Sequence, residues 1–589
     1  MFVSTRSRLW IGSLVILPMF FLSLATAQVK TADIVGIVTD NTGAVIPNAK
    51  VIARNVGTNG ERTTQTDSAG GYLFTLLPAA SYVVTAEMNG FKTEVVQNIT
   101  LAVGDRLKLD LHLTTGATQE TVNVTAEELG LQTQTSNLQS VIGEKAVQDL
   151  PVNNRNFATL AQLSVGANNS TQGFGGGTGP DDRRTTSTVQ VNGQWPWANN
   201  FQIDGQNNNE RFIGTTIVKP SVEAIQEMQI VTNLYPAELG RTAGAVINLI
   251  TKSGTNQLHG SLYEYFRNDI FDTPDVLTKK ASPYKQNQFG GSLGGPIIRD
   301  RTFFFGDYEG YRNRQGLVYL ESVPTDKMHV GDFSDLLLPE NGGIQIKDPV
   351  TSALYPGNII PANPGPGQTG IDPVGQNLMN YYPRSTSADR SLASNNYVSS
   401  PSQSLNTDTF DVKIDHKFSD RNLVFGRYSF ENVNSFLPGA YPAGNGIFGG
   451  TSIQRTQGAQ INYDHVFGPS WVTELRAGYD RYKIASYSFN YGVDLSQEAG
   501  LTGSNYDLLS SGLALFQVNG ESNLGGNMYE PELNTNNIYQ VGGSATHAAG
   551  LHSIKVGGEI RRIQVGQFQS PYASGAFSFV GLRRLCAGG

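Results

Sequence analysis

The sequence predicts a mainly β protein with an N-terminal β-sandwich, an α+β segment in the middle and an antiparallel membrane β-barrel. Turn signals recur at short intervals through residues 31–115. After residue 256, aromatic segments that alternate apolar and polar residues are separated by long polar loops. No segment after the N-terminus has the roughly 18 consecutive apolar residues that a membrane helix needs. A membrane span in this part of the chain must therefore be a barrel.

The composition of the chain limits its class. Charged residues make up only 16% of the 589 residues, while aromatics reach 10% and there are 66 glycines. This balance is typical of β-rich extracellular or outer-membrane proteins and argues against disorder. The net charge of −8 includes no basic block, so no nucleic-acid partner is expected. The single cysteine, Cys586, excludes an internal disulfide and a thiolate metal cluster.

The N-terminus has the pattern of a secretory signal peptide (1–27). Arg6 and Arg8 precede a short apolar run that ends in the small-x-small motif A-T-A. We expect cleavage between Ala27 and Gln28. The alternative, an uncleaved membrane anchor, is disfavoured because the apolar run is short.

Residues 31–115 are predicted to form a sandwich of seven short strands. The clearest strand alternates Leu107, Leu109, Leu111 and Leu113 with Lys108, Asp110 and His112. This period of two indicates a strand buried on one face. The segments I-V-G-I-V-T-D-N-T-G-A-V-I-P-N-A-K-V and T-D-S-A-G-G-Y-L-F-T-L-L-P resemble the carboxypeptidase regulatory-like domain. That resemblance implies a transthyretin-type sandwich, grouped with carbohydrate-binding-like folds, and implies no peptidase activity. Asp40 and Asp67 fit either an Asx-turn or a calcium site.

Residues 136–256 are predicted to form the compact α+β segment. Helical patterns are expected over 141–150, 158–163 and 221–229, and strands over 189–194, 200–205 and 229–232. The strands 189–194 and 200–205 are expected to pair with each other around Trp195, Pro196 and Trp197. The Gly-rich segment 171–180 lacks the Gly-Lys-Ser/Thr of a phosphate loop. The apolar run 245–250 ends this segment.

Residues 257–589 have the pattern of barrel strands. Outward apolar residues are expected at Phe410, Val412, Ile414, Phe418, Ala459, Ile461, Tyr463, Leu475, Ala477, Tyr479, Ile554, Val556 and Ile560. The intervening polar residues, such as Asp411, Lys413 and Arg476, would face a wet lumen. We expect ten to fourteen strands of nine to eleven residues. The tail L-C-A-G-G lacks the terminal aromatic strand that usually ends an outer-membrane barrel, so a truncated product is expected.

Several motifs in order resemble an Oar-like TonB-dependent receptor. They are L-P-V-N-N-R-N-F, V-N-G-Q, N-N-F-Q-I-D-G-Q-N-N-N-E, I-Q-E-M-Q-I-V-T-N, Y-P-A-E-L-G-R-T-A-G-A-V-I-N-L-I-T-K-S-G-T-N, H-G-S-L-Y-E-Y-F-R-N-D, N-Q-F-G-G-S-L-G-G-P-I and R-T-F-F-F-G-D-Y-E-G-Y-R. The resemblance spans most of the chain. It implies a 22-stranded barrel, which ten to fourteen strands would not close, and it implies that residues 136–256 form the plug inside that barrel. Trp195-Pro196-Trp197-Ala198 departs from the pattern, in which smaller polar residues are expected.

The same resemblance points to two sets of site residues. The linker 117–135 holds a candidate TonB box, formed by Glu120, Thr121, Val122, Asn123, Val124, Thr125 and Ala126. A TonB-type energy-coupling protein would add a strand to such a segment, although a plain linker strand has the same pattern. The plug–barrel junction is expected at Glu238, Arg241, Lys252 and His259. Glu238 and Arg241 could form an ion pair there or an ordinary exposed pair, and His259 would be structural.

No catalytic pattern is present in the sequence. It has no H-E-x-x-H or H-x-x-E motif and no G-x-S-x-G elbow, so we expect no enzyme and no cofactor. The leading hypothesis is a TonB-dependent transporter in the outer membrane that imports a large extracellular ligand, namely a glycan, a peptide or a metal chelate. Its sandwich would then lie in the periplasm and its barrel in the outer-membrane lipid. The alternatives are a non-transporting adhesin or carbohydrate-binding scaffold and, least favoured, a secreted metallocarboxypeptidase.

Overall fold

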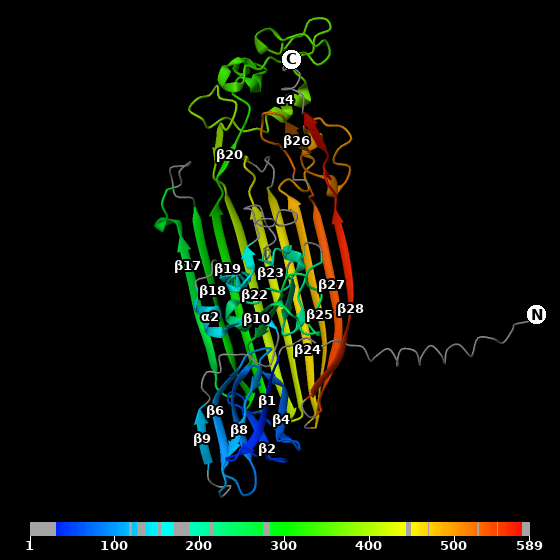
Figure 1. Cartoon of the computed structure of the whole chain (residues 1–589). Coiled ribbons are helices and arrows are strands. Elements are labelled where there is room, and N and C mark those ends of the chain that lie inside the picture. Colours follow the sequence, from blue (N-terminus) through cyan, green and yellow to red (C-terminus); the bar gives the residue numbers. More distant parts are fainter. Residues whose placement is uncertain are drawn as a thin grey trace, which may run out of the picture.

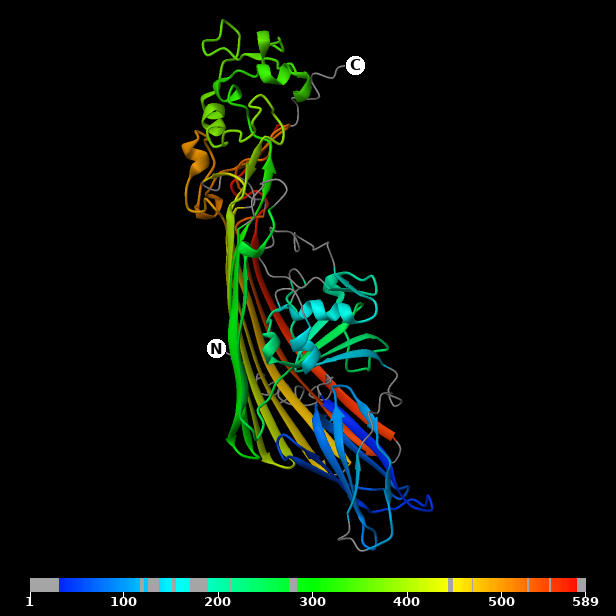
Figure 2. The same cartoon turned by 90° about the vertical axis from the view of Figure 1, so that its left-hand side faces the viewer.

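The computed structural model describes residues 31–116, 121–125, 137–150, 155–169, 189–211, 214, 216–274, 283–442, 449–468, 470–526, 529–549 and 552–579. The β-sandwich lies at one end of the long axis of the molecule, and loop-rich segments lie at the other (Figure 1). Between them, the plug lies on the concave face of a tall curved sheet, here called the wall (Figure 2). None of the helices in the described residues is long and apolar enough to cross a membrane.

The N-terminal sandwich consists of two packed sheets. One holds β1 (Thr31–Asp40), β4 (Gly71–Pro78), β7 (Arg106–Lys108) and β8 (Leu111–Leu113), and the other holds β2 (Lys50–Asn55), β3 (Glu61–Gln65), β5 (Ala80–Glu87), β6 (Thr93–Leu101) and β9 (Thr121–Thr125). The predicted alternation over 107–113 is confirmed, because Leu109, Leu111 and Leu113 are buried and the polar residues between them are exposed. This segment is two strands instead of one, β7 and β8, which both run parallel to β1.

The plug is built around a five-stranded sheet whose order is β10-β15-β16-β13-β14. Its elements are β10 (Leu138–Gly143), α2 (Glu144–Asp149), α3 (Phe157–Leu160), β11 (Ala167–Asn169), β12 (Val189–Val191), β13 (Asn200–Ile203), β14 (Gln206–Asn207), β15 (Ile225–Asn233) and β16 (Val246–Thr251), with 3-10 helices at Ala161–Leu163, Pro196–Ala198 and Val222–Ala224. The helix predicted over 158–163 is confirmed as α3 and the 3-10 helix that follows it.

Two predicted helices are partly wrong. Residues 141–143 belong to β10, and the helix that follows is only α2. In the segment 221–229, a 3-10 helix covers Val222–Ala224, and β15 begins at Ile225. Nearly every residue of β15 is buried, because the sheet is covered on both faces. A strand covered in this way loses the period of two, and its apolar residues then match a helical spacing by chance.

The predicted hairpin of 189–194 with 200–205 is also wrong. β12 pairs with β11, while β13 pairs with β14 and, in parallel, with β16. The segment around Trp195 therefore connects two different sheets. Long-range pairing with β16 outcompetes the local hairpin because β16 is a fully buried apolar strand.

Among the described residues, the wall contains nine antiparallel strands in the order β17-β18-β19-β22-β23-β24-β25-β27-β28. They are β17 (His259–Asn268), β18 (Tyr284–Ile298), β19 (Thr302–Gly316), β22 (Ser402–Ser419), β23 (Asn422–Leu437), β24 (Gly450–Gly468), β25 (Trp471–Ser488), β27 (Glu532–Ala549) and β28 (His552–Gln569). Most strands are 15 to 19 residues long, so fewer strands are found than expected. Within the described residues, β17 and β28 do not pair with each other.

The outward face of the wall carries two aromatic bands. In the band nearer the sandwich, Phe418, Phe467 and Trp471 each contact a histidine ring at 4.3 Å between centroids. The second band contains Phe410, Tyr428, Phe430, Tyr479 and Tyr539. Exposed aliphatic residues lie between the bands, including Val412, Ile414, Ile461, Leu475, Val541 and Val556. The two aromatic bands are about 26 Å apart along the strand, measured from Trp471 to Tyr479. This separation suits the apolar girdle of an outer-membrane barrel.

The wall strands continue beyond the second band into segments at the end opposite the sandwich (Figure 1). These segments contain β20 (Tyr319–Glu321), α4 (Pro373–Met379), β21 (Tyr397–Ser399), α5 (Leu495–Glu498), β26 (Leu515–Val518) and β29 (Ala576–Phe579), with 3-10 helices at Met328–Val330, Ser334–Leu337, Pro339–Asn341, Pro356–Asn358 and Leu508–Ser510. An apolar cluster that includes Val323, Tyr382, Tyr441 and Phe516 packs them together. The long loop predicted over 320–400 is therefore folded, and these packed segments are here called the platform.

Candidate functional site

The candidate coupling segment is a strand of the sandwich. Thr121–Thr125 forms β9, which pairs in parallel with Thr93–Gln97 of β6. β9 ends the sheet order β3-β2-β5-β6-β9, and no second strand pairs with it among the described residues. Val122 and Asn123 have exposed side chains, and Glu120 and Ala126 lie outside the described residues. The free edge of β9 is a template for an added strand.

The sandwich docks onto the plug through β15. The backbone N–H of Val103 donates to Glu227 Oε1 at 2.6 Å, and Gln229 Nε2 donates to the Val103 carbonyl at 3.3 Å. Ala79 and Val103 of the sandwich form a small apolar cluster with Ile250 of the plug. Burial raises the pKa of Glu227 to about 7, although the Val103 N–H opposes this shift. The contact between the two parts therefore includes a carboxyl that titrates near neutral pH.

A cavity of about 640 Å³ lies where the sandwich, the plug and the wall meet. Its lining is strongly charged and has both signs, with Arg62 from the sandwich, Lys252 from the plug, and Asp415, Lys417 and Asp464 from the wall. The sandwich also contacts the wall directly, because Asn59 Nδ2 donates to Asp300 Oδ1 at 3.0 Å. The sandwich end of the plug thus opens on a polar chamber.

The plug is tied to the wall by a buried ion cluster around Asp204. Asp204 and Gly205 both have positive φ values, 48° and 75°, and form the tight turn between β13 and β14. Arg427 Nε lies 3.0 Å from Asp204 Oδ2, and Lys413 Nζ lies 3.5 Å from Asp204 Oδ1. Thr251 Oγ1 donates to the same carboxylate at 2.7 Å. Only 2% of Asp204 is exposed.

The charge of Asp204 is set by two opposing effects. Burial alone would raise its pKa, because a charged carboxylate is poorly solvated in the interior. Lys413 and Arg427 outweigh that effect and hold the pKa of Asp204 below its usual value. The carboxylate is therefore charged, and its two cations come from β22 and β23 of the wall.

A second set of contacts continues from the same turn. Gln206 Nε2 donates to Asp480 Oδ2 at 2.8 Å, and the Asn207 N–H donates to Gln540 Oε1 at 3.3 Å. Arg561 Nη1 donates to Asn207 Oδ1 at 3.1 Å. These bonds join β14 to strands β25, β27 and β28. The I-D-G-Q-N segment is thus the main attachment of the plug to one half of the wall.

A third attachment holds the plug to β17. Arg155 Nη2 lies 2.6 Å from Glu223 Oε1, and Arg155 Nη1 donates to the Tyr265 hydroxyl at 2.8 Å. The guanidinium also stacks on the Tyr265 ring, 4.5 Å from its centroid. Nearby, Ser221 Oγ donates to Asp307 Oδ2 of β19 at 2.5 Å. These three attachments are polar, and an apolar contact supplements them, because Tyr482, Ile484 and Ile538 of the wall are buried in one cluster with the core of the plug.

The four predicted junction residues are placed differently from one another. Glu238 pairs with Lys555 of β28 at 3.2 Å instead of with Arg241. Arg241 Nη1 donates to Asn207 Oδ1 at 3.4 Å. Lys252 pairs with Glu144 at 2.9 Å inside the plug, and the ring of His259 contacts the Gln257 carbonyl at the start of β17. Ala27 and Gln28, the predicted cleavage residues, lie outside the described residues.

Sequence reasoning missed the ion cluster. Asp204 lies in the quoted motif I-D-G-Q-N-N-N-E, and its sequence signal was a charged residue directly after a buried strand in an Asp-Gly turn. Lys413 was predicted to point inward, which is confirmed, but it was predicted to contact water in the lumen. It is 7% exposed and meets the plug instead.

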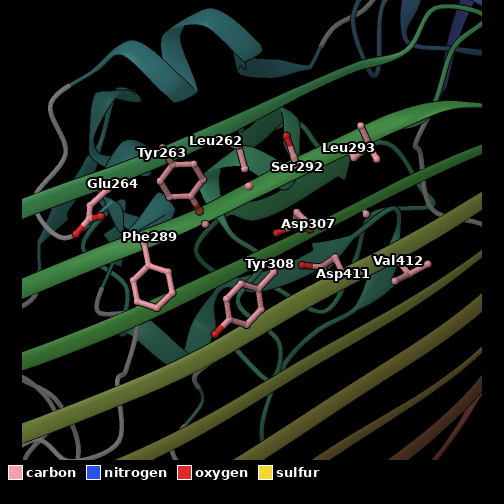
Figure 3. Close-up of a pocket in the computed structure, with 13 residues that line it drawn as sticks. Leu262, Tyr263, Glu264, Phe289, Ser292, Leu293, Asp307, Tyr308, Asp411 and Val412 are labelled. Atoms are coloured by element: carbon pink, nitrogen blue, oxygen red, sulfur yellow. The ribbon is translucent and has the colours of Figure 1, made fainter.

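A shallow groove of about 830 Å³ lies on the outward face of the wall, over β17, β18, β19 and β22. Gly291 and Gly306 line the groove without side chains, and the rings of Phe289 and Tyr308 lie beside each other at the groove (Figure 3). Leu262 at its rim is 92% exposed. Asp307 and Asp411 also contact the groove through their strands, but their side chains accept bonds from Ser221 and Ser429 on the plug side. The lining of the groove is mainly apolar, as expected for the outer surface of the wall.

These features define an outer-membrane β-barrel protein with a plug packed against the inner face of its wall. The chain belongs to the outer membrane beta barrel domain family, whose model matches residues 250–585. Residues 33–114 match the carboxypeptidase regulatory-like domain, which confirms the resemblance of the sandwich.

The similarity to Oar-like receptors is confirmed as well. The chain is 28% identical over 315 residues to the TonB-dependent transporter Oar of Myxococcus xanthus, and this alignment covers 50% of this chain and 28% of Oar. It is 28% identical over 204 residues to a probable TonB-dependent siderophore receptor, PirA, of Acinetobacter baumannii, which covers 32% and 24% of the two chains. The matches thus span about a quarter of the length of these relatives.

Solved structures were also matched. The outer membrane transporter YddB from Escherichia coli aligns with a TM-score of 0.44 and 12% identity, over 73% of this chain and 48% of that chain. The siderophore receptor PirA from Acinetobacter baumannii aligns with a TM-score of 0.34 and 15% identity, over 74% and 59%.

Proposed function

We propose that this chain is a TonB-dependent outer-membrane receptor that binds a large extracellular ligand and imports it with energy from the inner membrane. The observation that carries the proposal is the position of β9, an edge strand with one free side that directly precedes the plug in the chain. In this proposal the sandwich lies in the periplasm, and a TonB-type protein adds a strand to the free edge of β9.

Force applied to β9 would reach the plug at its weakest point. The next described strand along the chain is β10, which is the edge strand of the plug sheet and pairs only with β15 among the described residues. A pull on its N-terminal end would separate its six residue pairs from β15 one after another. Each backbone hydrogen bond contributes only about 0.5–1.5 kcal/mol net, so sequential opening needs far less force than breaking the whole sheet together.

The polar tethers suit the next step. Once β10 leaves, β15 loses one neighbour, and further loosening of the sheet would let water reach the ion cluster around Asp204, which lies beyond β16 in the strand order. Solvent screening weakens the attraction between Asp204 and its cations by several-fold. The plug can then rearrange while the wall stays intact. This rearrangement would open a path for the ligand from the platform to the cavity between the sandwich, the plug and the wall.

Two proline variants test the coupling step. Successive residues of a strand send their N–H groups to opposite edges, so one of Asn123→Pro and Val124→Pro removes a donor from the free edge of β9. Binding of the periplasmic domain of a TonB protein to the full chain in detergent is measured by surface plasmon resonance. We expect binding to the parent and loss of binding in at least one proline variant, while Asn123→Thr binds like the parent.

A parent chain that does not bind the TonB domain would refute the proposal. Equal binding by both proline variants would refute the assignment to β9. In cells, deletion of residues 119–126 should abolish energy-dependent uptake and leave surface binding of ligand unchanged. Uptake that survives this deletion would also contradict the proposal.

A further inference from the structure

A group of three cations lies on the outward face of the wall, between the second aromatic band and the platform. Arg455 of β24 points the same way as the exposed Ile461, because alternate residues of a strand face the same side. On β25, Arg481 and Lys483 share the face of the exposed Leu475 by the same alternation. Arg455 and Lys483 are exposed and Arg481 is half-buried. These three residues are here called the cation cluster.

The strand register brings the cation cluster together. Arg455 and Lys483 are direct cross-strand partners, so their Cβ atoms are about 4.5–5.5 Å apart. Arg481 is the diagonal neighbour of Arg455, at about 7–8 Å. Like charges placed directly opposite each other destabilise a sheet. A second exposed pair of this kind, Lys285 and Arg314, is found on β18 and β19 of the same face.

The neighbouring wall residues do not neutralise the cluster. None of its three cations forms an ion pair with a carboxylate of the described residues. Their partners on the next strands are the neutral residues Asn432, Thr535 and Asn537. The residues outside the described ranges that connect to these strands, 443–448 and 527–528, carry no charge in the sequence. The cluster is therefore a patch of positive charge without a counter-ion.

Two members of the cluster are held in place by the wall. Arg455 Nε and Nη2 both donate to Asn432 Oδ1 at 3.2 Å, and the guanidinium lies 5.9 Å from the centroid of the Phe430 ring. Arg481 lies beside the hydroxyl of Tyr479. These contacts fix the guanidinium of Arg455 along one edge and leave Nη1 for an incoming acceptor. A guanidinium held in this way matches the geometry of a phosphate.

The cluster lies at the level of lipid headgroups. Tyr428, Ala459, Tyr479 and Tyr539 form one row of direct cross-strand partners in the second band. Lys483 is four residues beyond Tyr479 toward the platform, which is about 13 Å along the strand. With a strand tilt of about 40°, this distance is about 10 Å along the membrane normal. Polar headgroups follow the hydrocarbon at that level.

The chemistry of this surface fits a lipid that carries both phosphate and sugar. Arginine and lysine donate charge-assisted hydrogen bonds to phosphate oxygens. The amides of Asn432 and Asn537 can bond to sugar hydroxyls, and the apolar surface between the two bands accommodates acyl chains. With the sandwich in the periplasm, the cluster faces the outer leaflet of the membrane.

We propose that Arg455, Arg481 and Lys483 form a binding site for a phosphorylated glycolipid of the outer leaflet. The bound phosphate supplies the counter-charge that the two opposed cations lack. This inference goes beyond the proposed function, with which it shares only the orientation of the chain in the membrane.

Native mass spectrometry of the full chain in a non-ionic detergent tests the site. The probe is diphosphoryl lipid A, titrated to give an apparent Kd. Phosphatidylglycerol and phosphatidylethanolamine are the comparison lipids, and inorganic phosphate is added in excess as a competitor. We expect lipid A to bind more tightly than either phospholipid, and inorganic phosphate not to displace it.

Paired substitutions give the decisive comparison. Arg455→Gln with Lys483→Gln should weaken lipid A binding roughly 30-fold, because each cation near an anionic lipid contributes about fivefold. Arg455→Lys with Lys483→Arg keeps both charges and should retain most of the affinity. The control, Arg299→Gln with Arg421→Gln, removes two exposed cations from the wall turns at the sandwich end and should bind like the parent.

The melting temperature without lipid should not fall in the double glutamine variant, because an opposed pair of like charges is removed. Three results would overturn the inference. They are equal affinity of the parent and the double glutamine variant, an equal loss in the control variant, and binding of phosphatidylglycerol or inorganic phosphate as tight as that of lipid A.

The same preparation separates this inference from the proposed function. Binding of the TonB domain is measured on the parent chain alongside lipid A. If the TonB domain binds and lipid A does not, only the lipid site fails. If lipid A binds with the expected dependence on the cation cluster and the TonB domain does not bind, the receptor proposal fails and the lipid site stands.

Discussion

Replacing Asp204 with asparagine tests how the plug is held to the wall. The change removes the carboxylate charge that lies 3.0 Å from Arg427 Nε and 3.5 Å from Lys413 Nζ, and leaves Arg427 only its weaker interactions with Asp411 and Asp480. Both cations are buried, at 4% and 7% exposure. Removing one partner of a buried pair costs about 3–5 kcal/mol, because an uncompensated charge stays buried. Asparagine retains an oxygen for Thr251, so we expect a loss near the lower end of that range.

The assay is guanidinium unfolding of the full chain in detergent, followed by the emission of Trp195 and Trp197 in a Trp471→Phe background, in which they are the only tryptophans of the chain after residue 27. For a plug-sized unit, an m-value of about 4 kcal/mol/M converts the loss to a fall in midpoint of about 1 M. Because the pKa of Asp204 is lowered, its contribution is complete above the unfolded pKa of about 3.9 and is lost as pH falls below it. The measurement at pH 7 therefore reports the whole contribution.

A surface ion pair provides the control. Asp420 pairs with Lys417, but its side chain is 70% exposed, and such pairs contribute about 0–1 kcal/mol. Asp420→Asn should leave the midpoint nearly unchanged. Asp204→Asn combined with Lys413→Met should recover part of the loss, since one unpaired cation is removed. A midpoint for Asp204→Asn equal to that of Asp420→Asn would refute the reasoning.

Three further predictions follow from other contacts. The pKa of Glu227 is raised to about 7, so the folded state keeps a proton that the unfolded state releases near pH 4.5. The free energy that stabilises the docked sandwich therefore falls by up to about 3 kcal/mol as pH rises from 4.5 to 7. Glu227→Gln should flatten the dependence of melting temperature on pH in that window, and an unaltered dependence would contradict the assignment. Gly254 lies between β16 and β17, and Gly254→Ala would place a Cβ 2.3 Å from the Phe304 carbonyl oxygen and should lower the melting temperature. Gly468→Ala, with no atom within 4 Å of the added Cβ, should not. Equal melting temperatures would show that the segment between β16 and β17 is not tightly packed against β19. Arg155→Lys loses the fork that contacts both Glu223 and Tyr265, and should speed exchange of the backbone amides of α3 without affecting those of β16; identical exchange in the parent and the variant would speak against this tether.

The wall could be predicted from sequence because its strands face two different environments. Val412 and Ile414 lie toward lipid, while Asp411 and Lys413 point to the plug, so the pattern has a clear period of two. The number of strands was overestimated because β24 and β25 extend well past the membrane band, and nothing in the local pattern marks where the membrane ends.

The plug was harder to predict for the opposite reason. β15 and β16 are buried on both faces, so their side chains do not alternate. The ion cluster could not be predicted from the sequence, because Asp204, Lys413 and Arg427 are far apart in the chain and come together only when the plug packs against the wall. The edge position of β9 likewise depends on its pairing with β6, which no local pattern encodes.

The most direct test of the account asks whether energy from the inner membrane opens β10. Ile142 in β10 is 6% exposed, so a cysteine placed there by Ile142→Cys, with Cys586→Ser, should be shielded from a maleimide reagent at rest. In cells with an active TonB system we expect labelling to rise when the inner membrane is energised, and to stay low when it is uncoupled or when β9 carries the inactivating proline. Val38→Cys in the sandwich core should stay unlabelled throughout. Labelling of Ile142→Cys that is the same in energised and uncoupled cells would contradict the claim that force on β9 opens the plug.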